Sequence, residues 1–114
     1  MAKRKDRRRR PPPPTSDYTD GDGNVLTLRQ QLSAGTIRKL AEPPAGAAAT
    51  VEDAWRRREE ALFERLAVRW EIAGLPIEKQ SMLLGRYRMA SERERRWVRE
   101  TIAAHVESFL PELS

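Results

Sequence analysis

The chain contains neither proline nor glycine from Val51 until Gly74. Thr50 can cap a helix that begins at Val51, because Asp53 stands three residues later, in the order of a capping box. Glycine commonly closes a helix at its C-terminal end. A single helix over residues 51–73 is therefore predicted, and this one element would make up a large part of a small folded domain.

The apolar residues of this predicted helix recur at helical spacing, which is typical of a helix that packs on one side. Phe63, Val68 and Ile72 widen the apolar stripe toward its C-terminal end. Trp55 lies at the more polar end, where a tryptophan can either belong to a small core or anchor a partner. The residues predicted to bind a protein partner are Trp55, Leu62, Leu66 and Trp70.

Three shorter patterns predict further helices. They cover residues 33–41, 77–89 and 91–110. Ser33 is a suitable N-cap for the first, and Ser91 with Glu94 forms a capping box for the last. Helices joined by short connections pack as bundles. The predicted fold class is therefore all-α, a small three- to four-helix bundle.

The first part of the chain has a different composition. The like charges of MAKRKDRRRR repel one another, and the four prolines that follow favour an extended spacer. The predicted organisation is a disordered basic, proline-rich tail over residues 1–19, a turn and short extended arm over 20–32, and a helical domain over 33–113 with a flexible linker near 43–49.

The formal net charge of +5 is concentrated in the first ten residues, which contain seven Lys/Arg and one Asp. The rest of the chain contains 15 basic and 16 acidic residues, so the predicted domain is nearly neutral. A basic tail can bind phosphates non-specifically by releasing counterions, although it can also be a solubilising end without a ligand. The alternative function is thus nucleic-acid binding through Lys3, Arg4, Lys5, Arg7, Arg8, Arg9 and Arg10.

The segment Asp20–Asn24, DGDGN, begins like a calcium-binding loop. Val25 stands where such a loop needs glycine, and Gln31 stands where it needs a bidentate glutamate. Asp, Gly and Asn are also the residues that favour turns. A plain turn is therefore predicted, with no metal site and no cofactor.

The sequence carries no pattern typical of a catalytic site. His105, the single histidine, falls beside the apolar stripe of the last predicted helix, where packing is favoured over a role as a base. Carboxylates alternate with arginines, as they do on solvated helix faces. We therefore predict that the chain is not an enzyme.

Cysteine is absent, which suits a reducing compartment. The basic start leads into prolines instead of the apolar run of a signal peptide, and no apolar stretch is long enough to cross a membrane. A cytoplasmic protein without membrane contact is expected. A chain this short buries a small core, so a protein partner or a second copy that covers an apolar face would add stability.

Four segments carry a resemblance to a known family: DGDGNVLTLR (Asp20–Arg29), an alanine-rich middle, LAVRWEIAGLPI (Leu66–Ile77) and FLPEL (Phe109–Leu113). In this order they resemble the small helical tail assembly chaperones encoded by phages of actinobacteria, over about residues 20–113. The resemblance implies a factor that coats the long helical tape measure protein and hands it to tube subunits, by burying apolar helix faces in a groove.

The sequence therefore favours two functions. The leading one is a non-enzymatic protein-binding or assembly module, and the alternative is binding of nucleic acid through the basic tail. A cytosolic protein of actinobacterial type without such a role, indicated by 18 Arg against 4 Lys and by abundant alanine, accounts for the same composition.

Overall fold

The computed structural model describes residues 13–42 and 50–114. In chain order they form β1 (Thr15–Thr19), β2 (Val25–Arg29), α2 (Ala34–Ala41), α3 (Val51–Leu66), β3 (Ala67–Ile72), β4 (Leu75–Ile77), α4 (Gln80–Arg88), α5 (Glu92–Phe109) and the short 3-10 helix η1 (Pro111–Leu113). The basic segment and the linker predicted near 43–49 lie outside the described residues.

The prediction of an all-α helical bundle is wrong, because the helices accompany a four-stranded antiparallel sheet in an α+β fold. The strands follow the chain order β1-β2-β3-β4, and each pairs with the next. The predicted helix over 51–73 begins where expected, with Thr50 Oγ1 accepting a hydrogen bond from the Asp53 N–H at 3.1 Å. It ends at Leu66, and the chain continues directly into β3.

The change from helix to strand follows from the segment VRWEI over residues 68–72. Its apolar and charged residues alternate with period two, and valine, tryptophan and isoleucine all favour strands. Arg69 and Glu71 lie two residues apart on one face, where Arg69 Nη2 and Glu71 Oε1 form an ion pair of 2.9 Å. Residues at this spacing do not face each other on a helix, so the charge pair fits the strand and not the predicted helix.

Ala73 and Gly74 form the two-residue turn between β3 and β4, with Ile72 opposite Leu75. Their φ angles are 52° and 81°. Positive φ at both central positions is the property of a type I′ turn, whose twist matches that of the strands it joins. Gly74 therefore closes a β-hairpin and not the helix that the sequence predicted to end there.

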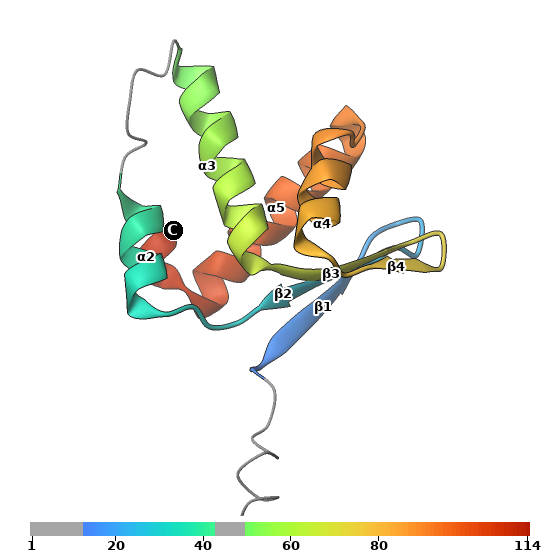
Figure 1. Cartoon of the computed structure of the whole chain (residues 1–114), viewed down its shortest axis with the longest axis horizontal. Coiled ribbons are helices and arrows are strands. Elements are labelled where there is room, and N and C mark those ends of the chain that lie inside the picture. The colour runs from blue at the N-terminus through green and yellow to red at the C-terminus, as the bar shows by residue number, and fades with distance from the viewer. Residues whose placement is uncertain (1–12, 43–49) are drawn as a thin grey trace, which may run out of the picture.

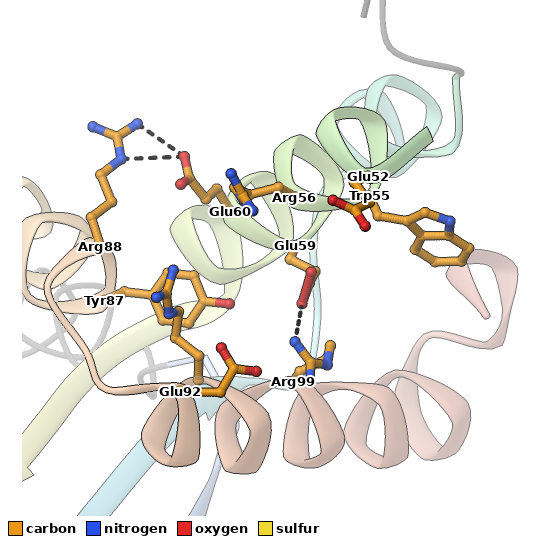
Figure 2. A pocket seen from close by; sticks show the side chains of 10 residues that line it. Glu52, Trp55, Arg56, Glu59, Glu60, Tyr87, Arg88, Glu92 and Arg99 are labelled. Carbon is orange, nitrogen blue, oxygen red and sulfur yellow. Dashed lines mark hydrogen bonds and ion pairs between the residues drawn. The ribbon is translucent and has the colours of Figure 1, made fainter. Parts of the chain in front are cut away.

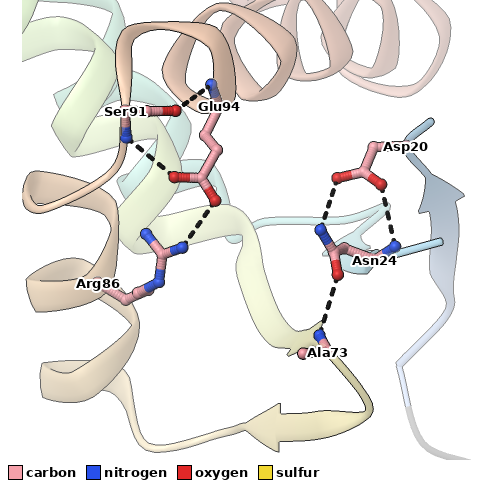
Figure 3. A network of polar contacts seen from close by, with 6 residues as sticks. All are labelled: Asp20, Asn24, Ala73, Arg86, Ser91 and Glu94. Atoms are coloured by element: carbon pink, nitrogen blue, oxygen red, sulfur yellow. Dashed lines mark hydrogen bonds and ion pairs between the residues drawn. The ribbon is translucent and has the colours of Figure 1, made fainter. Parts of the chain in front are cut away.

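The predicted disorder of residues 1–19 extends too far along the chain. Thr15–Thr19 lies in this range but forms β1, which pairs along its whole length with β2. β2 agrees with the predicted extended arm. The turn between them has the expected chemistry, because Asp20 Oδ1 accepts from the N–H groups of Asp22 and Asn24 at 2.8 and 3.0 Å. Asn24 Oδ1 in turn accepts from the Ala73 N–H at 3.0 Å, which joins the two hairpin turns (Figure 3).

The helices α2 and α5 begin at their predicted caps. Ser33 Oγ accepts from the Thr36 N–H at the start of α2. Ser91 and Glu94 form the predicted capping box of α5, with bonds of 3.1 Å from the Glu94 N–H to Ser91 Oγ and 2.9 Å from the Ser91 N–H to Glu94 Oε1 (Figure 3). α4 is shorter than predicted, because Ile77 belongs to β4.

The core lies between the sheet and the helices, which are seen on one side of it (Figure 1). Four side chains in register across the strands form a row toward this core: Tyr18, Leu26, Trp70 and Ile77. From the helices, Phe63 stacks on Tyr87 with ring centroids 4.7 Å apart and meets Trp70 edge-on at 5.8 Å. The aromatic contacts thereby fix the C-terminal end of α3 against both α4 and the sheet.

Candidate protein-binding site

The N-terminal half of α3 extends away from the sheet, whereas its C-terminal half enters the core (Figure 1). Trp55, on the projecting half, is 63% exposed. Leu62, about two turns further on, is half-buried. An indole ring left this exposed on an ordered helix is a candidate anchor for another macromolecule.

The structure does not bring the four predicted partner-binding residues together on one exposed face. Leu66 is 0% exposed and Trp70 is 1% exposed, and Trp70 lies on β3 instead of on the same helix. Both residues are core. Trp55 and Leu62 are therefore the two members of the predicted set that a partner can reach.

A cavity of about 510 Å³ lies beside Trp55 and Leu62, between α3 and α5. Its opposite wall comes from residues outside the predicted partner-binding set: Ile102, Ala103 and Val106 of α5, and Leu113 of η1. The three residues of α5 are spaced as the apolar residues of any amphipathic helix are, so the sequence indicated that this face packs against something but not that it lines a site. The direction in which α3 projects decides which part of the apolar face of α5 stays accessible.

A second cavity of about 520 Å³ continues from the first toward α4. The two cavities share Trp55, Glu59, Tyr87 and Arg99. Together they form one surface, which we call the α3–α5 groove and define by the linings of both cavities. Figure 2 shows its more polar part, with Trp55 at the N-terminal end of α3.

Two ion pairs connect the walls of the groove. Arg99 Nη1 of α5 lies 3.1 Å from Glu59 Oε2 of α3, and Arg88 Nη2 of α4 lies 3.0 Å from Glu60 Oε1 (Figure 2). The hydrogen bond to Glu59 raises the pKa of Arg99 above its ordinary value. These contacts join helices that diverge toward the open end of the groove, so they set the distance between its walls.

Tyr87 forms part of the floor of the groove and is almost fully buried. Burial, followed by the negative charge of Glu59, raises the pKa of its hydroxyl to about 12. The phenol therefore stays protonated at physiological pH. With its ring stacked on Phe63, Tyr87 is a rigid support beneath the ion pair between Arg99 and Glu59.

The apolar end of the groove is held by Arg58. Its Nη1 donates to the carbonyl oxygen of Leu40 at 2.6 Å, and its Nη2 donates to that of Leu113 at 2.8 Å. The planar guanidinium thus connects α2, α3 and η1 through backbone acceptors near helix ends. Leu113 is held in place as a lining residue for this reason.

His105 lies outside the groove, on the side of α5 that faces the sheet. The Tyr18 hydroxyl donates to His105 Nδ1 at 2.6 Å, and His105 Nε2 donates to the carbonyl oxygen of Arg29 at 2.7 Å. Both nitrogens are used if the ring is neutral and carries its proton on Nε2. Burial lowers the pKa of His105, and the hydrogen bond to Arg29 opposes this shift. The predicted packing role agrees with these contacts.

The remaining predictions concern the basic segment, metal binding and membrane contact. The basic residues from Lys3 to Arg10, predicted as the alternative nucleic-acid contact, lie outside the described residues. In the ranges 13–42 and 50–114, no three His, Asp or Glu side chains are grouped so that they could hold a metal ion. Among the helices of that same part of the chain, none is long and apolar enough to cross a membrane.

Comparison of the chain with protein-family models, with curated proteins and with solved structures finds no match. The resemblance to tail assembly chaperones stays a prediction from the sequence. The α3–α5 groove is therefore the feature of this chain that bears on its function.

Proposed function

We propose that this chain is a non-enzymatic protein-binding module that receives an amphipathic helix of its partner in the α3–α5 groove. The observation that carries the proposal is Trp55, 63% exposed at the edge of an apolar cavity. Tryptophan anchors placed beside a desolvated pocket contribute a large share of binding energy in protein interfaces. Leu62, Ile102 and Val106 provide the apolar wall against which the partner's apolar stripe would pack.

The charges of the groove favour a protein over a polyanion. The apolar cavity is lined by two arginines and two glutamates, and the more polar cavity by four arginines and four glutamates. A nearly neutral surface gives little of the counterion release that drives phosphate binding. Mixed charges beside an apolar strip instead complement a helix that carries both signs on its flanks.

The resemblance to tail assembly chaperones of actinobacterial phages indicates one class of partner. In that family the client would be a long helical tape measure protein, which presents many amphipathic segments in succession. A cytoplasmic location would follow from such a role. We include this chaperone-like role in the proposal. Binding of nucleic acid is the alternative, and nuclease treatment in the crosslinking experiment distinguishes it.

Site-specific crosslinking tests the groove directly. A photo-reactive phenylalanine analogue replaces Trp55 in one variant and Met89 in a matched control, because Met89 is 83% exposed at the end of α4 and lines neither cavity of the groove. Both proteins are irradiated in the native cell, and adducts are mapped by mass spectrometry to the segment of the captured protein. A synthetic peptide of that segment is then titrated with the wild-type chain and with Trp55→Ala.

The proposal predicts adducts from position 55, resistant to nuclease, that map to an amphipathic helical segment. The peptide should bind about tenfold or more weakly to Trp55→Ala, in line with the loss of an interface anchor. Equal adducts from positions 55 and 89 would contradict a specific groove. Adducts that disappear with nuclease would instead favour binding of nucleic acid.

A further inference from the structure

The projecting half of α3 presents apolar and charged groups in an order that can complement itself. Val51 is 73% exposed and precedes Trp55 by one helical turn, so the two side chains share a face. Glu52 and Arg56 flank this face, and both line the more polar cavity of the groove. Within the described residues neither Glu52 nor Arg56 forms an ion pair.

An antiparallel copy of the same helix reverses this order. If a two-fold axis passes near Trp55, Glu52 of one copy lies opposite Arg56 of the other, and the symmetry forms this pair twice. The two pairs are on the same flank of the helix, because equivalent flanks meet in an antiparallel helix pair. Trp55 of each copy then packs at the centre, beside Trp55 and Val51 of the other.

We propose that the α3–α5 groove is first occupied by α3 of a second copy of this chain, in an antiparallel two-fold dimer. This inference rests on the groove proposed above and names its occupant when no other partner is bound. The dimer covers the exposed indole and pairs Glu52 with Arg56 across the axis. α3 is accessible for such a contact because its N-terminal half stands clear of the sheet (Figure 1).

The size of the contact sets the strength of this dimer. Two helical turns on each side bury less surface than a standard stable interface, which needs about 1,200 Å² or more in total. We therefore expect a weak dimer that forms with increasing concentration and yields to a partner helix with a longer apolar stripe. Self-association would in this way cover Trp55 when the concentration of the chain is high.

Charge reversal tests the pairing in the full-length chain. The E52R and R56E variants each place like charges opposite one another in a homodimer. A mixture of the two restores both opposite-charge pairs in a heterodimer. Asp53→Arg and Arg57→Glu are matched controls, because these positions lie on the side of α3 away from Trp55 and line neither cavity. Sedimentation equilibrium over micromolar to millimolar concentrations measures the dissociation constant of every sample.

We expect a wild-type dimer, an increase of about tenfold or more in the dissociation constant of each of E52R and R56E, and recovery in their equimolar mixture. The two control variants should dimerise like the wild type. A wild-type chain that stays monomeric throughout, or a mixture that fails to recover, would overturn the dimer. If position 55 still crosslinks to a helical partner in that case, the groove function stands and only its occupancy by a second copy fails.

Discussion

Single residues with the same chemistry have different roles in this chain, according to where the backbone places them. Trp55 and Trp70 were predicted as members of one apolar stripe, and the side chains are chemically identical. The chain leaves its helix at Leu66, so Trp70 enters the core from β3 while Trp55 stays on the projecting half of α3. The polar neighbours of Trp55 set it apart, but helical spacing still placed both indoles on one helix face.

Ala73 offers a stabilising substitution at this scale. Its φ of 52° lies in the left-handed region, which costs an ordinary side chain about 1–2 kcal/mol. Asparagine tolerates this region better, and Asn-Gly is the preferred pair for a type I′ turn. Ala73→Asn should therefore raise the free energy of unfolding by about 0.5–1 kcal/mol in urea titration. Gly74→Ala, at φ 81°, is the opposite control and should destabilise the hairpin.

His105 predicts how stability depends on pH. Burial holds its pKa in the folded state below 6.5, so the unfolded chain takes up the proton first as the pH falls. The contribution is fully present above about pH 6.5 and is lost progressively below it, toward the folded-state pKa. The melting temperature should fall between about pH 7 and pH 5. His105→Gln should remove this part of the pH dependence; an unchanged slope would mean that other groups cause it.

At the scale of elements, the helix starts that carry a side-chain cap could be predicted, whereas the start of α4 and the end of α3 could not. Thr50, Ser33 and Ser91 cap helices by local hydrogen bonds, and local chemistry is readable from neighbouring residues. The end of α3 depends on pairing between β3 and β2, which are far apart in sequence. The alternation VRWEI was the available signal for β3, but its apolar residues also continued the helical stripe.

The capping box of α5 is an element whose contribution can be measured. Glu94 bonds to the Ser91 N–H and also forms an ion pair with Arg86 of α4 at 2.7 Å. The hydrogen bond from Arg86 is the largest cause that lowers the pKa of the Glu94 carboxyl, and the hydrogen bond from the Ser91 N–H is the next. Ser91→Ala should cost about 1–2 kcal/mol in unfolding free energy. Ser33→Ala, which removes a cap from the short α2, should cost less; a larger loss for Ser33→Ala than for Ser91→Ala would contradict this ranking.

At the scale of the whole molecule, the sheet and the C-terminal half of α3 build a core that leaves the other half of α3 free. The groove arises because α3 and α5 diverge from this core, with Arg99 and Glu59 bridging them and Arg58 fixing η1 beneath. The sequence indicated a more polar first half of this helix and a wider apolar stripe toward its C-terminal end. The opposite wall could not be predicted, because it is set by how α5 crosses the sheet.

The proposed groove requires Trp55 to lie outside the core, and thermal unfolding of Trp55→Ala beside Trp70→Ala tests this directly. Trp55→Ala should keep a melting temperature close to that of the wild type, since surface substitutions change stability by about 0.5 kcal/mol or less. Trp70→Ala should lose about 3–5 kcal/mol and unfold at a much lower temperature. A comparably large loss for Trp55→Ala would place its indole in the core, and the open groove with its proposed function would be contradicted.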